Sequence, residues 1–159
     1  YTSFSYLKEL RADTVLNYKK QRFDDRADKY DVIYDLVGGD TLDRSFKVIK
    51  ADGKVISIAG KPEPITASDL NGRFLLKALF YLASRTQLRL ARNARAQYRY
   101  VFMKASGAQL REIASLIDAG RLKVSVDKIF TLDDYRAAFD YQESGKAKGK
   151  VIIAITGGK

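Results

Sequence analysis

The first half of the chain carries a pattern of apolar runs that predicts a strand, a helix and a second strand. Residues Tyr30 to Val37 form a nearly continuous apolar run ending at Gly38-Gly39, which predicts a strand buried on both faces of a parallel sheet. A helix should follow, with Thr41 as its N-cap, apolar residues at i, i+4 and i+7, and Gly53 just past its end. The second strand is predicted from Val55 to Ala59.

The rest of the chain continues this alternation. Apolar periodicity predicts a helix capped by Ser3 and then a short strand at residues 14–17. Further helices are predicted at residues 72–96, 106–120 and 131–139, and further strands at residues 97–105 and 149–155. Ser106 has capping-box spacing to Gln109, and Gly120 should end that helix. Alternating units of this length predict an α/β fold with a mostly parallel sheet.

Length and composition indicate one globular body. The chain has 159 residues, of which 46% are hydrophobic, which is enough for a domain with its own core. It contains no apolar run near the roughly 18 residues of a membrane span, and no charged-then-apolar leader. We therefore expect no membrane partner and a cytoplasmic location.

The absence of two residue types limits the available chemistry. The sequence has no Cys and no His, so disulfides, thiolate ligands and the commonest acid/base and zinc-binding side chain are missing. We expect no metal site in this chain. Catalysis would have to use Tyr, Ser, Lys, carboxylates or a bound cofactor.

The net charge of +10 is concentrated in one region. No Asp or Glu occurs from Leu70 to Arg111, and arginines recur there at helical spacing, at positions Arg85, Arg89, Arg92, Arg95 and Arg99. This basic stripe could contact nucleic-acid phosphates. The preferred interpretation is a solvated or interface-facing helix, because the apolar face lacks a base-stacking platform of exposed aromatic residues.

Three predicted loops follow the carboxyl ends of strands, where doubly wound sheets bind dinucleotides. They lie at residues 37–39, 59–61 and 103–104. The diagnostic G-x-G-x-x-G motif is missing, so spacing alone also allows ordinary turns for these glycines. Asp31 and Asp35 would stand about 13 Å apart along their strand, and we interpret them as structural.

Three ordered blocks carry a resemblance that covers nearly the whole chain. They read LKELRADTVLNY, then YDVIYDLVGGDTLDRSFKVIKADGKVISIAG, then GAQLREIASLIDAGRLKVSVDKIFTLDDYRAAFDYQESGKAKGKVIIAI. Together they resemble the C-terminal half of a medium-chain dehydrogenase/reductase, in the quinone oxidoreductase branch of the zinc-type alcohol dehydrogenase family. The resemblance implies a partial Rossmann fold, without its first βαβ portion, plus the return segment of a GroES-like catalytic domain. Residues 1–121 would be the distal part of the NADP(H)-binding domain and residues 122–159 the return segment, so the chain would be a fragment.

The resemblance also implies residues near the adenosine end of the cofactor. Tyr18 matches a tyrosine beside the adenosine 2′-phosphate, and an exposed strand-end tyrosine is the structural alternative. Lys19 could contact the same phosphate, although lysines beside strands are usually just solvated. Ser3 would lie near that phosphate too, and helix capping explains it equally well.

The other implied cofactor contacts come from the loops. Val37 and Gly38 match the loop that passes the adenosine ribose. Ala59, Gly60 and Lys61 match the loop beside the nicotinamide ribose. Phe102 and Met103 match a strand end that approaches the nicotinamide ring, with core packing as the alternative.

The activity implied by the resemblance is hydride transfer from NADPH to a quinone or related enone, in a branch that commonly lacks catalytic zinc. The fragment alone should be inactive. We expect a homo-oligomer formed through exposed sheet edges. The alternatives are a self-associating structural fragment without catalysis and, less favoured, a nucleic-acid-binding module.

Overall fold

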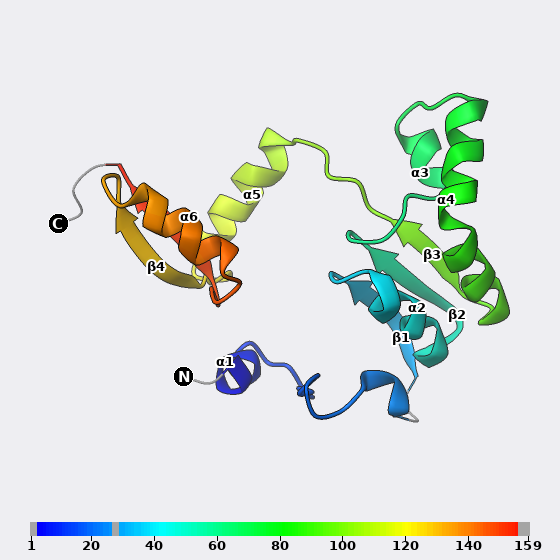
Figure 1. The fold of residues 1–159 in the computed structure, drawn as a ribbon, viewed down its shortest axis with the longest axis horizontal. Helices are drawn as coiled ribbons and strands as arrows, with labels where there is room; N and C mark the ends of the chain where they lie inside the picture. The colour runs from blue at the N-terminus through cyan, green and yellow to red at the C-terminus, as the bar shows by residue number, and fades with distance from the viewer. Residues whose placement is uncertain (1–2, 27–28, 156–159) are drawn as a thin grey trace. The chain divides into compact units, whose positions relative to one another are not determined.

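Three parallel strands form the sheet of one unit of the molecule. The computed structural model describes residues 3–26 and 29–155. It divides into one unit from Thr14 to Lys104 and another made of the described residues up to Asp13 and from Ala105 onward. In the first unit, β1 (Tyr30–Asp35), β2 (Ile49–Ser57) and β3 (Gln97–Tyr100) pair in the order β1-β2-β3 (Figure 1). The predicted α/β fold with parallel strands is confirmed.

Helices connect these strands. Helix α2 (Gly39–Val48) joins β1 to β2, and helices α3 (Pro64–Asp69) and α4 (Phe74–Asn93) lie between β2 and β3. A short 3-10 helix, η1 (Phe23–Asp25), precedes β1. The long helix predicted at residues 72–96 is therefore present as α4, with its ends two or three residues inside the predicted range.

The core lies on one face of the sheet. The buried cluster consists of Leu42, Phe46, Ile49, Val55, Ala91 and Tyr98, from α2, β2, α4 and β3. Successive strand residues point to opposite faces, and Val32 and Tyr34 of β1 remain 57% and 59% exposed. The prediction that this strand is buried on both faces is therefore wrong for the described residues. The helices α2 and α4 cover only the face that carries the core cluster.

Two predicted positions around α2 are wrong. The helix begins at Gly39, because the Gly38 carbonyl already accepts a hydrogen bond from Leu42 N at 3.3 Å, so Thr41 is not the N-cap. Gly53 lies inside β2 instead of after the helix. At this site the β1–β2 register is irregular, and a Cβ on Gly53 would lie 2.9 Å from the Asp31 carbonyl oxygen. Close approach of two backbones thus explains this glycine.

Two predicted strands are absent or shorter. Residues 14–17 form no strand, and β1 pairs only with β2, so the described chain offers that segment no hydrogen-bonding partner. A strand needs such a partner to satisfy its backbone groups. The strand predicted at residues 97–105 ends at Tyr100, although Val101 N still donates to the Ser57 carbonyl at 2.9 Å.

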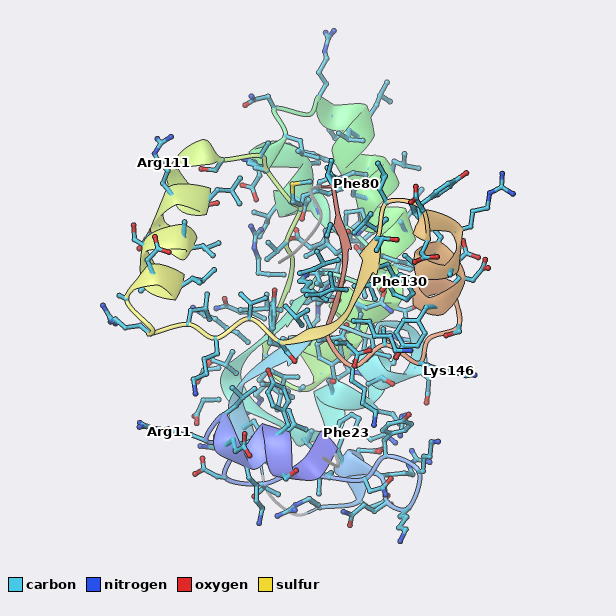
Figure 2. All side chains as sticks on the ribbon, turned by 90° about the vertical axis from the view of Figure 1, so that its left-hand side faces the viewer. Arg11, Phe23, Phe80, Arg111, Phe130 and Lys146 are labelled. Atoms are coloured by element: carbon cyan, nitrogen blue, oxygen red, sulfur yellow. The ribbon has the colours of Figure 1, made fainter. Side chains whose placement is uncertain are left out.

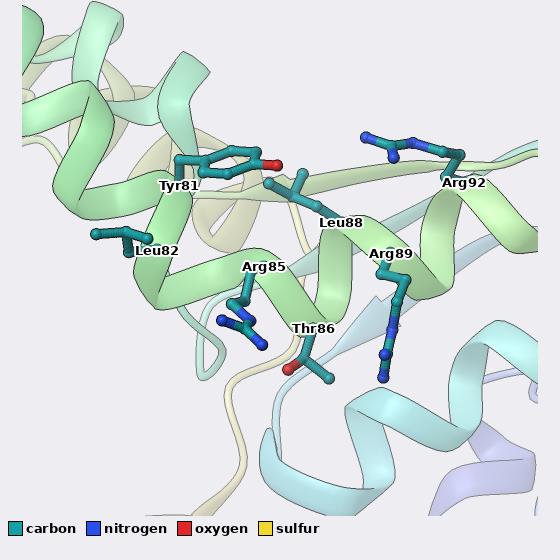
Figure 3. Close-up of a pocket in the computed structure, with 7 residues that line it drawn as sticks. All are labelled: Tyr81, Leu82, Arg85, Thr86, Leu88, Arg89 and Arg92. Carbon is teal, nitrogen blue, oxygen red and sulfur yellow. The ribbon is translucent and has the colours of Figure 1, made fainter.

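The predicted basic stripe is divided between elements. Arg85, Arg89 and Arg92 lie on α4 and line a cavity of about 330 Å³, and Figure 3 shows Arg92 on a different side of the helix from the other two. Arg95 follows the helix with a φ of +53°. Arg99 belongs to β3 and forms an ion pair with Glu63 at 3.0 Å. Arg99 is therefore a structural cation, and the five arginines form no single helical stripe.

The other unit contains a second parallel pair. Strands β4 (Val126–Thr131) and β5 (Lys150–Ala154) pair, and α6 (Tyr135–Glu143) packs on both. Phe130, labelled on β4 in Figure 2, lies with its ring centroid 6.1 Å from that of Tyr141 on α6. This unit also contains α1 (Ser3–Glu9) and α5 (Gly107–Asp118).

The predictions for both ends of α5 are confirmed. Ser106 Oγ accepts a hydrogen bond from Gln109 N at 3.3 Å, so Ser106 is the predicted N-cap. Gly120 has the left-handed φ of +67° that the predicted C-terminal glycine requires.

The predicted boundary between a cofactor-binding part, residues 1–121, and a return segment, residues 122–159, remains a prediction. None of the helices in the described ranges combines the length and the apolar character that crossing a membrane requires.

Candidate functional site

The carboxyl ends of β1 and β2 are joined by a buried pair of polar side chains. Asp35 and Ser57 are paired in register at these ends, and Ser57 Oγ donates to Asp35 Oδ2 at 2.6 Å. Asp35 is 4% exposed and Ser57 is fully buried. Asp31, by contrast, lies at the surface and forms an ion pair with Lys50. Both aspartates thus have the structural roles expected of them.

This buried pair holds the two glycine-containing loops. Asp35 Oδ1 accepts from Val37 N at 3.2 Å and from Gly38 N at 3.0 Å. Ser57 Oγ accepts from Ala59 N at 3.1 Å and from Gly60 N at 2.8 Å. One connected network of hydrogen bonds therefore holds both loops from the sheet, and the backbone N–H groups of the loops point toward it.

The loops also touch each other. Gly38 has a φ of +75° and a ψ of −163°, a combination that essentially only glycine adopts. A Cβ on Gly38 would lie 3.1 Å from the Ala59 carbonyl carbon and still closer to its oxygen. The structure thus brings together Val37, Gly38, Ala59 and Gly60, which the sequence had assigned to two separate cofactor contacts.

Lys61, the last residue of the second loop, is held by a tyrosine of β3. Tyr98 Oη donates to the Lys61 carbonyl at 2.8 Å and accepts from Lys61 N at 3.1 Å. The Tyr98 hydroxyl lies in the core, and burial raises its pKa well above the ordinary value of 10.0. It therefore stays protonated and keeps both hydrogen bonds.

A buried carboxylate fixes the next turn of the chain. Glu63 is 1% exposed and caps α3 by accepting from Ile65 N and Thr66 N. Arg99 donates to Glu63 at 3.0 Å and to Asp69, at the other end of α3, at 2.8 Å. A single guanidinium of β3 thus holds both ends of this helix.

Tyr18 and Val37 line one cavity. Its volume is about 370 Å³, and its lining residues are Leu16, Tyr18, Gln21, Arg22, Phe23, Val37, Thr41 and Arg44. Tyr18 is 85% exposed, so its hydroxyl is accessible from solvent. Lys19 follows in a turn, where its backbone N–H donates to Asn17 Oδ1 at 3.0 Å, and it does not line the cavity.

Three cations beside this cavity share one carboxylate. Asp24 lies 2.9 Å from Arg22, 3.1 Å from Arg44 and 3.2 Å from Lys47. The hydrogen bond from Arg22 is the largest cause of a pKa for Asp24 well below its ordinary value of 3.8. Asp24 therefore orders the Arg22 and Arg44 side chains of the cavity wall.

The depressed pKa of Asp24 predicts acid sensitivity. The unfolded chain takes up a proton near pH 3.8, whereas the folded chain does so only at lower pH. The stabilisation is therefore fully present above that pH and is lost as pH falls below it. We expect Asp24→Asn to flatten the decline of the unfolding free energy in acid, measured by urea denaturation. Asp25→Asn is the control, because Asp25 is exposed and 3.9 Å from Arg22. An acid slope unchanged by Asp24→Asn would contradict this.

The other predicted residues are Phe102, Met103 and Ser3. Phe102 and Met103 follow β3 and are 50% and 82% exposed, so core packing within the described chain does not explain them. The Phe102 ring packs against Tyr100 at a centroid distance of 5.7 Å. Ser3 is the first residue of α1, in the other unit, and not a cap before it. The structure therefore groups the loop residues and, separately, Tyr18 with Val37.

Four residues that support this edge were not predicted from the sequence: Ser57, Glu63, Tyr98 and Arg99. Only Glu63 had a local signal, since Pro64 occupies the first turn of α3 directly after it. The others act on backbone or side chains brought near by the fold, and no spacing in the sequence marks them. The described residues also contain no group of three or more acidic side chains that could hold a metal, and the sequence has no His or Cys.

A parallel sheet with glycine turns packed together at its carboxyl edge places the chain among α/β folds of the Rossmann-like type. Residues 10–153 match the family described as zinc-binding dehydrogenase, so the chain belongs to that family. Among the residues that the structure describes, no group of side chains forms a zinc site.

Relatives and solved structures agree with this assignment. The chain is 29% identical over 149 residues to 2-methylene-furan-3-one reductase of Solanum lycopersicum, and 28% identical to the chloroplastic NADPH-dependent alkenal/one oxidoreductase of Arabidopsis thaliana. These alignments cover 92% of this chain and 30% of each relative. The chain thus spans about a third of the length of these relatives.

Two solved structures show the same fold. The quinone oxidoreductase of Coxiella burnetii matches 96% of this chain and 42% of its own, with a TM-score of 0.70 at 22% identity. A thermostable alcohol dehydrogenase of Pyrobaculum aerophilum matches 95% of this chain and 39% of its own, with a TM-score of 0.64 at 26% identity. The chain therefore belongs to an oxidoreductase family, and each of these four proteins is substantially longer than it.

Proposed function

We propose that this chain is part of an NADPH-dependent oxidoreductase that reduces quinones or related enones. The observation that carries the proposal is the carboxyl edge of the sheet, where Gly38 and Ala59 lie in contact above the buried Asp35–Ser57 pair. Ligands of such sheets bind outside this edge. Similarity to the quinone, alkenal and furanone reductases supports the type of substrate.

The residues at this edge fit a dinucleotide. The cavity beside Val37 has mostly apolar walls for an adenine ring, and Tyr18 could donate to the 2′-phosphate, with Lys19, the next residue in the chain, adding to that contact. Val37 and Gly38 would contact the adenosine ribose, and Ala59, Gly60 and Lys61 the nicotinamide ribose. The exposed Phe102 and Met103 would lie beside the nicotinamide. Bound NADPH would supply the hydride, while the protein orients it and excludes water.

We expect the isolated 159-residue chain to bind NADPH no better than about millimolar and to reduce no quinone. The chain contains no G-x-G-x-x-G loop to hold the pyrophosphate. The remaining contacts each contribute about 1 kcal/mol, which does not offset the roughly 4–15 kcal/mol cost of immobilising a ligand. Calorimetric titration of the isolated chain measures this directly. A micromolar dissociation constant would contradict it.

In the full-length protein, Tyr18→Phe tests the site itself. Loss of one hydrogen bond to the 2′-phosphate should weaken NADPH binding about five- to tenfold. NADH lacks that phosphate, so its affinity should not change. Tyr81→Phe is the matched control, because Tyr81 is a half-exposed tyrosine on α4. Equal losses of affinity for NADPH and NADH would show that Tyr18 does not contact the 2′-phosphate.

A further inference from the structure

Two adjacent residues of β3 hold the end of the second loop from opposite faces of the sheet. Tyr98 points into the core, and its hydroxyl contacts the Lys61 backbone. Arg99 points to the other face and contacts the Glu63 carboxylate. Neighbouring strand residues necessarily face opposite ways. The segment from Lys61 to Glu63 is therefore fixed at two points by a strand more than thirty residues away in sequence.

The Tyr98 contact fixes one peptide orientation. A single hydroxyl accepts from Lys61 N at 3.1 Å and donates to the Lys61 carbonyl at 2.8 Å. Gly60 has no space for a side chain here, because a Cβ would lie 2.6 Å from Leu42 Cδ2 and 2.5 Å from Tyr98 Oη. The loop is thus close-packed against the hydroxyl, and a phenylalanine at position 98 would keep the ring while leaving both Lys61 groups without this partner.

The Arg99 contact fixes the continuation of the loop. Arg99 reaches the buried Glu63 and also Asp69, so it connects the loop to both ends of α3. Thr66 Oγ1 lies 3.0 Å from Glu63 Oε1 and 3.1 Å from the Tyr100 carbonyl, which attaches α3 to β3 as well. Movement of Lys61 would therefore have to break contacts on both faces of the strand.

We propose that Tyr98 and Arg99 are positioning residues that hold residues 59–61 in the conformation that receives the nicotinamide half of the cofactor. This inference rests on the proposed function. The backbone N–H groups of Ala59, Gly60 and Lys61 all donate to side chains of the sheet, Ser57 and Tyr98. The loop is then ordered before ligand binds, and pre-ordering of a binding loop reduces the entropy lost on binding.

The test compares Tyr98→Phe with Tyr100→Phe in the full-length protein. Tyr100 is two residues along the same strand, and its hydroxyl makes no hydrogen bond in the part of the chain that the structure describes. Amide hydrogen exchange at residues 59–61 should accelerate about tenfold in Tyr98→Phe and not in the control. KM should rise about tenfold for NADPH and NADH alike, with kcat changing less, because both cofactors share the nicotinamide half.

Arg99→Gln provides a second variant on the opposite face, should Tyr98→Phe fail to fold, and Arg99→Lys should restore part of the loss. Faster exchange with unchanged KM values, or an effect on NADPH alone, would overturn the positioning role. A wild-type protein that oxidises neither cofactor would instead show that the proposed function is wrong, and the inference would fail with it.

Discussion

Replacing Gly38 with alanine should lower the free energy of unfolding by about 3–5 kcal/mol. The residue has a φ of +75° with an extended ψ, where an L-residue is strained. The added methyl group would also collide with the backbone of Ala59, which belongs to the opposing loop. Backbone cannot rotate away as a flexible side chain can, so the two loops must separate.

The Gly39→Ala variant separates the cost of backbone strain from the cost of a steric collision. Gly39 also has a positive φ, +55°, but a Cβ there would meet nothing within 4 Å. Its loss should be about 1 kcal/mol, the ordinary cost of a left-handed alanine. Urea denaturation of the two variants and the wild type measures the difference. Similar losses for both glycines would show that the Gly38–Ala59 contact is not a close one.

Both ends of α5 were predictable because their signals are local. Ser106 needs only its own hydroxyl and the amide three residues on, and Gly120 needs only its own φ. The helix at residues 72–96 has a long periodic pattern that no neighbour has to complete. These elements follow from interactions within one turn of chain, which the sequence records directly.

Strand positions were less predictable because they depend on partners. Residues 14–17 have a strand-like composition, yet nothing in the described chain pairs with them. The apolar run at residues 30–37 suits burial on both faces, but the described helices cover only one. The predictions that Thr41 caps α2 and that Gly53 follows it were wrong for a related reason. The start of α2 and the irregularity in β2 are set by contacts with β1 and its loop.

The position of the two glycine loops was predicted from the sequence, but the side chains that hold them were not. The apolar pattern placed both loops at the carboxyl edge of the sheet, where the structure has them. The side chains that fix them were missed, because Tyr98 acts on Lys61 and Arg99 on Glu63 only after β3 has paired with β2. Arg99 even fitted a helical stripe by spacing. A periodicity of charges cannot distinguish a solvated arginine from one that neutralises a buried carboxylate.

Removing the Asp35 side chain should cause the second-largest loss in the free energy of unfolding, after the substitution of Gly38. Its carboxylate accepts from Val37 N, Gly38 N and Ser57 Oγ in a buried position. Asp35→Ala leaves these donors without an acceptor, and unsatisfied buried groups cost about 1–3 kcal/mol each. Some will recover a partner in water near the loop, so we expect a net loss of about 3 kcal/mol in the free energy of unfolding.

Two comparisons show whether this loss comes from the acceptor and not from the strand. Asp31→Ala removes an exposed aspartate from the same strand and should change stability by no more than about 0.5 kcal/mol. Asp35→Asn keeps one acceptor oxygen but turns an amide toward donors, so its loss should fall between the two, at about 1–2 kcal/mol. Because Ser57 connects Asp35 to the second loop, hydrogen exchange should also accelerate at Ala59 and Gly60 in Asp35→Ala. Acceleration confined to Val37 and Gly38 would mean that Ser57 holds the second loop without Asp35, and the two loops would then be independent.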